Sequence, residues 1–160
     1  MLYLGLKALH IVSVVMFLGN ITTGIFWKEH ADRSRDPRLI VHALAGIIHS
    51  DRLFTIPGVF GVILGGVGAA IAGHFPILST GWILWGIVLF SASGIAFGAQ
   101  VAPLQVRMLK LMQAGVASDT PDWEGYQTLS RTWAFWGAVA LLLPLVALVV
   151  MVLKPALPAF

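Results

Sequence analysis

His10 is the residue of this sequence best suited to chemistry, because it is a titratable side chain inside an apolar stretch that runs from Leu2 to Trp27. A polar or ionisable side chain is costly within hydrocarbon, so it normally faces the interior of a helix bundle and marks a functional position. A neutral imidazole in a dry bundle is a good axial ligand for haem iron. It can equally donate a hydrogen bond to a carbonyl or hydroxyl group of a neighbouring helix, and the residues alone leave both roles open.

Lys7 lies three residues before His10, on the same face of the expected helix. Its aliphatic stem can carry the ammonium group outward to the membrane surface, while the imidazole stays inside, about 12 Å from the outer end of the helix. The other histidines fall too far along the expected helices to meet His10 within one bundle. A haem at His10 would therefore be five-coordinate or take a second ligand other than histidine, unless the helices shifted or a second copy of the chain supplied one.

Glycines follow Pro57 in the second apolar segment. Pro57 is expected to kink that helix. Gly61 and Gly65 are four residues apart and make a small-residue face, which lets another helix or a flat cofactor approach closely. Helix packing is the favoured interpretation, and the glycines alone do not identify a cofactor.

The chain contains no cysteine, which excludes disulfides, thiolate metal sites, iron–sulfur clusters and Cys-attached haem. Met108 and Met112 are spaced like neighbours on one helix face, where a thioether pair can bind copper(I), although packing is the favoured role. No phosphate-binding loop, paired membrane carboxylate or His-Glu zinc helix is present, so motifs for a kinase, a hydrolase or a carboxylate-driven proton pump are missing. Asn20, Thr22, Thr23 and Gln100 are expected to make hydrogen bonds between helices.

Composition determines the architecture. The chain has 160 residues, of which 58% are hydrophobic and 11% charged, unlike a water-soluble domain. A helix needs about 20 apolar residues to cross about 30 Å of hydrocarbon. Four segments meet this requirement, and they predict a single-domain, all-α integral membrane four-helix bundle over residues 1–160. The expected spans are residues 2–27, 53–73, 82–103 and 132–153.

Basic residues predict the orientation, because eight of the ten Lys and Arg residues lie in the two long connections between spans. Basic loops stay on the cytoplasmic side. Both termini are therefore expected outside or in the periplasm, with helices two, three and four extended into the cytoplasm. The caps Asp36-Pro37 and Thr120-Pro121 predict the starts of helices two and four, and Gly115 predicts the end of helix three.

The extension of the second helix carries a basic stripe. It consists of Arg38, His42, His49 and Arg52, at helical spacing. A solvated or lipid-headgroup face is the favoured interpretation, and a docking surface for an anionic ligand or partner is the alternative.

Three stretches carry a resemblance to known proteins. They read KALHI at positions 7–11, DRLFTIPG at positions 51–58 and VMVLKP at positions 150–155. With these stretches the chain resembles a bacterial family of predicted integral membrane proteins of unknown function, related to the HemJ and CopD-like membrane families. The resemblance covers nearly the whole chain and implies a multi-pass protein of the bacterial inner membrane.

The more distant similarity to HemJ, a haem-binding protoporphyrinogen oxidase, implies roles for particular residues. Lys7 and His10 resemble the opening of its first helix, where the histidine is a functional residue, and Arg52 with Pro57 resembles its second helix. The third helix departs from the HemJ pattern, because Gly94-Ile95-Ala96-Phe97 stands where HemJ carries a histidine.

Residues and resemblance together predict a membrane protein that binds haem b, acting in electron transfer or as a haem-dependent oxidoreductase. The expected haem site comprises His10 as axial ligand with Lys7, Arg52, Gly61 and Gly65. The alternative is a cofactor-free accessory or assembly subunit of a larger membrane complex. A third hypothesis is CopD-like copper handling through Met16, Met108 and Met112. The expected partners are the lipid bilayer, a membrane redox or complex partner and a second copy of the chain, and no nucleic acid.

Overall fold

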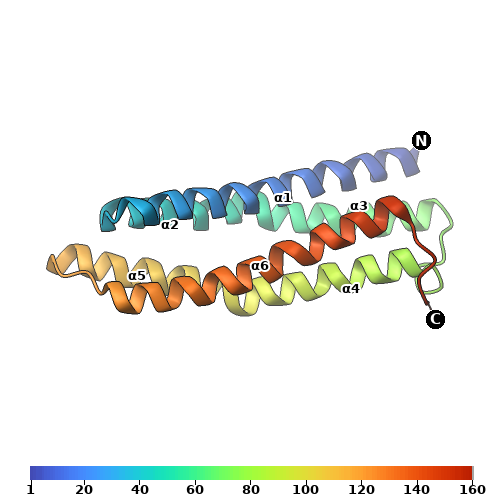
Figure 1. Ribbon diagram of the computed structural model, residues 1–160. Coiled ribbons are helices and arrows are strands. Elements are labelled where there is room, and N and C mark those ends of the chain that lie inside the picture. The colour runs from blue at the N-terminus through green and yellow to red at the C-terminus, as the bar shows by residue number, and fades with distance from the viewer. Residues whose placement is uncertain (160) are drawn as a thin grey trace.

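A computed structural model describes residues 1–159, which form helices and contain no strand (Figure 1). The helices join into four continuous rods, each long and apolar enough to cross a membrane. This arrangement confirms the predicted all-α class with four membrane-spanning helices. The rods are α1 (Leu2–Ser34); α2 (Pro37–Ser50), η1 (Asp51–Thr55) and α3 (Ile56–Ala72); α4 (Gly81–Ala96), η2 (Phe97–Val101) and α5 (Ala102–Ser118); and α6 (Trp123–Leu153).

The second and third rods each contain a short π-helical segment, η1 and η2, immediately before a proline-containing turn. Pro57 is the second residue of α3, and Pro103 is the second residue of α5. Proline lacks an N–H group and its ring crowds the carbonyl group four residues earlier, so the preceding turn has to adjust. Such π-bulges occur frequently at functional sites. At Pro57, where the sequence predicts a kink, the structure places the π segment η1 just before the proline.

The second rod begins where the sequence predicts. The carboxylate of Asp36 accepts a hydrogen bond from the backbone N–H of Arg38 over 2.8 Å, and Pro37 is the first helical residue. Proline suits this position, because its missing N–H would have no partner within the helix.

The prediction for the end of the third rod was wrong. α5 continues beyond Gly115 to Ser118, and Asp119 closes it in the left-handed conformation with φ of 56°. Gly115 instead permits a close approach of the chain, since a Cβ atom there would lie 2.7 Å from the Cα of Pro121.

The predicted start of the fourth rod also needs correction. α6 begins at Trp123, and its cap is Asp122, whose carboxylate accepts a hydrogen bond from the N–H of Gly125 over 2.9 Å. Thr120 instead shares a hydrogen bond of 2.8 Å with the hydroxyl of Ser118. A charged carboxylate is a better partner for the helix N-terminus than a hydroxyl, because it also interacts with the helix dipole.

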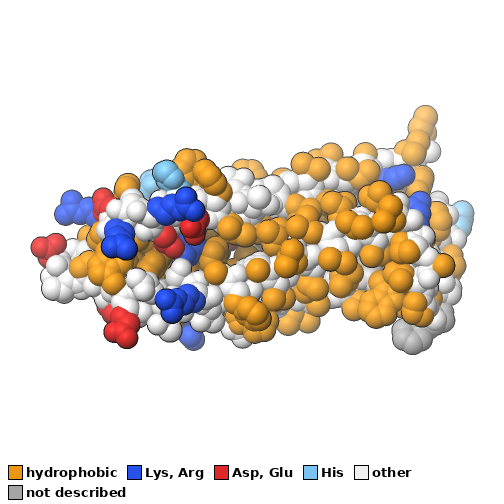
Figure 2. Space-filling model, in the orientation of Figure 1, with side chains coloured by type: hydrophobic (Ala, Val, Ile, Leu, Met, Phe, Trp, Pro, Cys, Tyr) orange, Lys and Arg blue, Asp and Glu red, His pale blue; other side chains and the backbone are white. Residues whose placement is uncertain are grey.

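Both chain ends lie at the same end of the bundle, which we call the terminal end (Figure 1). The opposite end, formed by α2, α5 and the adjoining parts of α1 and α6, carries most charged side chains and is called the charged end (Figure 2). Between the two ends the surface shown is almost free of charge and rich in exposed apolar side chains (Figure 2). An apolar belt of this kind fits the hydrocarbon of a bilayer. Which end faces the cytoplasm stays a prediction.

The rods form two pairs. α1 packs against α3 and α2, α6 packs against α4 and α5, and the pairs meet through α2 and α5 at the charged end. Within residues 1–159, no Cα atom of α3 comes within 8 Å of one in α4 or α6. Nearer the terminal end the pairs touch through Phe17 and Phe90, whose ring centroids are 5.5 Å apart. The tightest packing therefore lies at the charged end, where Ile40, Leu44, Met108 and Met112 are almost completely buried.

Candidate functional site

Asp51 is a buried carboxylate at the junction of three rods, with 8% of its surface exposed. Its Oδ1 atom accepts hydrogen bonds from Asn20 Nδ2 over 3.1 Å and from Thr55 Oγ1 over 2.8 Å. Its Oδ2 atom accepts one from Gln105 Nε2 over 3.1 Å. Asn20 Nδ2 also donates to Thr55 Oγ1 over 2.9 Å. We call these four residues the Asp51 centre.

The helices place the centre through their buried faces. Asp51 and Thr55 are the first and last residues of η1, and they continue a buried stripe that includes Leu44 and Ile47 of α2. Gln105 occupies the buried face of α5 just beyond η2. Both π segments therefore border the same site, which lies where the bundle passes from the charged end into the apolar belt.

The side chains that donate hydrogen bonds to Asp51 are all neutral. Two ion pairs with N–O distances within 4.0 Å occur in the described part of the chain, Lys28 with Asp32 and Arg33 with Glu29. Asp51 belongs to neither pair, and the adjacent Arg52 is exposed. A buried carboxylate normally has a cationic partner, because removing its charge from water is costly. At Asp51 the amides of Asn20 and Gln105 and the hydroxyl of Thr55 take the place of a cationic partner.

A small cavity of about 20 Å³ adjoins the centre. It is lined by Asn20, Asp51 and Gln105, and on α6 by Trp133. Trp133 is 5% exposed, and its indole Nε1 has no hydrogen-bond partner, the one such buried side-chain atom among residues 1–159. A cavity needs about 10–15 Å³ to hold one water molecule. The cavity beside the Asp51 centre therefore has room for about one water molecule, and it is lined by a tryptophan whose buried N–H group has no acceptor.

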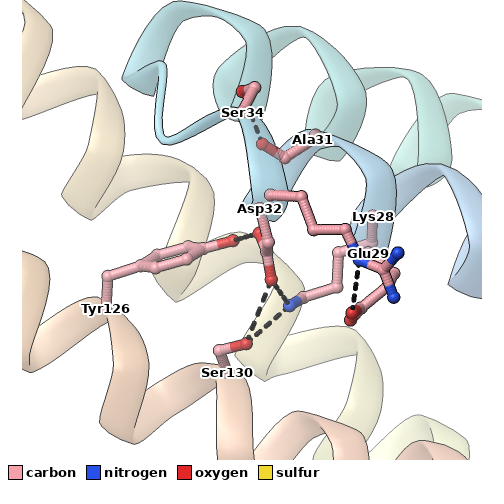
Figure 3. A network of polar contacts seen from close by, with 8 residues as sticks. Lys28, Glu29, Ala31, Asp32, Ser34, Tyr126 and Ser130 are labelled. Atoms are coloured by element: carbon pink, nitrogen blue, oxygen red, sulfur yellow. Dashed lines mark hydrogen bonds and ion pairs between the residues drawn. The ribbon is translucent and has the colours of Figure 1, made fainter.

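A second polar cluster lies farther toward the charged end, between α1 and α6 (Figure 3). Lys28 is 3% exposed, and its ammonium forms an ion pair with Asp32 and a hydrogen bond with Ser130, each at 2.5 Å. Tyr126 donates its hydroxyl hydrogen bond to the other oxygen of Asp32 over 2.5 Å. Unlike Asp51, the carboxylate of Asp32 is thus compensated by a full positive charge.

Trp133 lies near both polar clusters. The Nζ atom of Lys28 lies 5.0 Å from the centroid of the Trp133 ring and 5.6 Å from that of Tyr126, within the range of cation–π attraction. Trp133 also lines the cavity at Asp51, so this one residue lies beside both the Lys28 cluster and the Asp51 centre.

His10 makes the hydrogen bond that was one of its two expected roles. Its Nδ1 atom lies 2.9 Å from the backbone carbonyl oxygen of Val62 on α3. A carbonyl oxygen can only accept, so Nδ1 is the donor of this hydrogen bond, and Nε2 takes no part in it. His10 is half-buried, at some distance along α1 from Asn20 and the Asp51 centre.

The glycines of α3 face α1. A Cβ atom at Gly65 would lie 2.7 Å from the backbone N of His10, and one at Gly66 would lie 2.8 Å from its Nδ1. A Cβ atom at Gly61 would collide with Ser13 of α1. The glycine face therefore lets two helices pack closely, the role favoured from the sequence, and it lets the imidazole of His10 reach the carbonyl of Val62.

The remaining predicted residues lie apart from one another. Lys7 is exposed and its ammonium lies 5.9 Å from the centroid of the Tyr3 ring. The four members of the basic stripe, Arg38, His42, His49 and Arg52, are all exposed, as a solvated or headgroup face requires. The structure does not bring Arg52 to His10, and both lie outside the cavity beside Asp51.

The methionines proposed for copper are largely packing residues. Met108 and Met112 have no exposed surface and lie in the apolar core with Ile40 and Leu44. Met16 lies on α1 beside Gly58. In the part of the chain that the structure describes, no three His, Asp or Glu side chains come together as a metal-binding group.

Sequence reasoning missed Asp51, Thr55, Gln105 and Trp133 as site residues. Asp51 belongs to the stretch DRLFTIPG, and it lies just before the expected second span, 53–73, so the sequence did not single it out as a site residue. A usable signal was present, because Asp51 and Thr55 continue the helical spacing of Leu44 and Ile47, so they fall on the core-facing stripe.

These features define an integral membrane bundle of four long helices with a buried polar centre. The chain belongs to the family described as predicted integral membrane protein (DUF2269), whose model matches residues 4–155. No curated protein and no solved structure matches it. The predicted relationship to the HemJ and CopD-like families gains no support from these comparisons and stays a prediction.

Proposed function

We propose that the protein is a membrane protein that takes up and releases a small cation, in the simplest case a proton, at Asp51. The observation that carries this proposal is a carboxylate with 8% exposure that has three neutral donors, no cationic partner and a cavity beside it. Ionisable groups placed within membrane bundles typically serve proton or ion movement.

The surrounding side chains can serve both charge states of Asp51. With the carboxylate ionised, Asn20, Thr55 and Gln105 all donate to it. When a proton binds to Oδ2, that oxygen becomes a donor, and the amide of Gln105 can turn so that its carbonyl oxygen accepts. The oxygen and nitrogen of an amide have nearly the same shape, so this exchange needs little space.

Infrared difference spectroscopy tests the proposal on the full chain in lipid nanodiscs. Across a pH titration, the wild type should gain the carbonyl stretching band of a protonated carboxylic acid, in an environment shielded from water. Asp51→Asn should lose that band, because the amide keeps the shape but cannot take up the proton. Asp119→Asn is the matched control at an exposed carboxylate, and it should retain the band. A wild-type spectrum without the band, or a band that persists in Asp51→Asn, would refute the proposal.

Haem b binding at His10 is a second candidate function. It is favoured by the hydrogen bond from Nδ1 to Val62, because metal-ligating histidines are commonly oriented in this way, which leaves Nε2 to coordinate. Haem bound there would supply one-electron redox chemistry. His10 would provide the ligand, and Val62 would fix its tautomer.

Absorption spectra distinguish this second candidate. Protein purified from cells supplied with a haem precursor should show a Soret band and a reduced α-band, and His10→Ala should lose both while still folding. A colourless wild type would overturn haem binding without affecting the proposal for Asp51.

A further inference from the structure

We propose that the Asp51 centre is a binding site for a monovalent metal cation of the size of Na⁺, which competes with the proton for the same carboxylate. The inference rests on the proposed function, because it names a second occupant of that site. It is carried by the oxygen ligands around Asp51 together with the unpartnered indole of Trp133.

Each of the three side chains that hydrogen-bond to the carboxylate carries an oxygen atom. Asp51 contributes its two carboxylate oxygens, and Thr55 contributes a hydroxyl oxygen that can turn its hydrogen away. Asn20 and Gln105 each present an amide whose nitrogen now donates to Asp51. Turning either amide would place its carbonyl oxygen where the N–H group is, and would convert a ring of donors into a ring of cation ligands. Carboxylate, carbonyl and hydroxyl oxygens are hard ligands that suit alkali and alkaline-earth cations.

Trp133 provides the independent observation. Trp133 lines the cavity, and its buried Nε1–H group has no acceptor, which is unfavourable for a buried donor. The cavity has room for one water molecule that could accept this hydrogen bond, whereas the cation would lie among the oxygens of Asp51, Thr55 and the turned amides rather than in the cavity. The unpaired indole thus indicates a water molecule in the cavity, and the oxygens around Asp51 indicate a cation beside that water.

Charge and size select the cation. One carboxylate neutralises one positive charge, whereas a divalent ion would remain uncompensated among neutral ligands. Mg²⁺ also retains several of its water molecules and needs regular octahedral geometry, and Ca²⁺ takes about 6–8 oxygen ligands. A cavity of about 20 Å³ has no room for a hydrated ion. A small site with an ionised carboxylate favours the more compact Na⁺ over K⁺.

The test uses the full chain in nanodiscs and follows the protonated-carboxyl band of Asp51 at increasing NaCl concentration. Because Na⁺ and the proton compete for one carboxylate, the midpoint of the titration should fall by about one pH unit for each tenfold rise in Na⁺ once the site saturates. Chloride salts of N-methyl-D-glucamine and K⁺ at equal ionic strength are the controls, and they should shift the midpoint much less. Trp133→Phe should need about tenfold more Na⁺ for the same shift, the equivalent of one lost hydrogen bond.

The outcomes separate this inference from the proposed function. A midpoint that moves equally with NaCl and N-methyl-D-glucamine chloride would overturn the Na⁺ site, yet leave the titrating carboxylate in place. Equal shifts with NaCl and KCl would overturn the size selection. A wild type that lacks the carboxyl band at every pH, and is unaffected by Na⁺, would overturn the proposed function itself. A shift specific to Na⁺ that is weakened in Trp133→Phe would support the site.

Discussion

The side-chain amide of Gln105 donates a hydrogen bond to the carboxylate of Asp51 over 3.1 Å, between residues 54 positions apart in the chain. Asp51 begins η1 and Gln105 follows η2, so this bond connects the two rods at their π-helical segments. Each segment precedes a proline, and each borders the same small cavity. The two π-helical segments thus meet at Asp51. Among residues 1–159, Asp51 is the one buried carboxylate without a cationic partner.

Lys28→Met is expected to destabilise the protein strongly. The substitution keeps the length of the side chain but removes the buried ammonium, leaving Asp32 with only Tyr126 and Ser130. Loss of one partner from a buried ion pair costs about 3–5 kcal/mol. Denaturant unfolding in detergent measures the free energy of unfolding.

Arg33→Met is the matched control for Lys28→Met. Arg33 pairs with Glu29 at the same helical spacing, but both side chains are mostly exposed, so the loss should be at most about 1 kcal/mol. Equal losses in the two variants would show that the Lys28 cluster contributes no more than a surface ion pair.

Gly65→Ala should weaken the packing of α1 on α3. Its Cβ would lie 2.7 Å from the backbone N of His10, and backbone atoms cannot move aside as a flexible side chain can. Overpacking of this kind costs about 1–3 kcal/mol. Gly94→Ala, in α4, meets no atom within 4 Å and should gain up to about 1 kcal/mol through its better helix propensity. Thermal unfolding shows whether stability falls in Gly65→Ala and rises in Gly94→Ala. A Gly65→Ala protein as stable as the wild type would contradict the close approach of α1 and α3.

Trp133→Phe should leave the fold almost as stable as the wild type. Phenylalanine keeps an aromatic face toward Lys28 and removes an N–H group that has no protein acceptor, so the change should stay within about 1 kcal/mol. Trp133→Ala should lose about 3–5 kcal/mol, because it empties a large buried volume. The same unfolding measurement applies to both, and a loss in Trp133→Phe as large as in Trp133→Ala would show that the N–H group is firmly bonded.

Hydropathy was sufficient to predict the four spans, because long apolar helices are the simplest way to satisfy the backbone within hydrocarbon. The start of α2 followed from local chemistry at Asp36 and Pro37, whose cap geometry involves neighbouring residues only. The end of α5 did not, since the position of Gly115 depends on the returning chain at Pro121.

The site was harder to predict than the spans. His10 lies inside an expected span, where an ionisable residue is conspicuous, whereas Asp51 lies at the boundary of one, where a charged residue is common. Asn20 was expected to bond a neighbouring helix, and it does, but its partner required knowledge of how three rods meet. The orphaned indole of Trp133 depends on packing alone, and no sequence pattern reveals it.

The most direct test of the proposal is the side-chain carbon resonance of Asp51 in protein labelled with ¹³C-aspartate, measured in nanodiscs across a pH titration in N-methyl-D-glucamine chloride. The resonance is assigned as the one that Asp51→Asn removes. We predict that it moves from the position of an ionised carboxylate to that of a carboxylic acid as the pH falls, while the fold remains intact. A resonance that keeps one position until the protein unfolds would contradict reversible proton binding at Asp51.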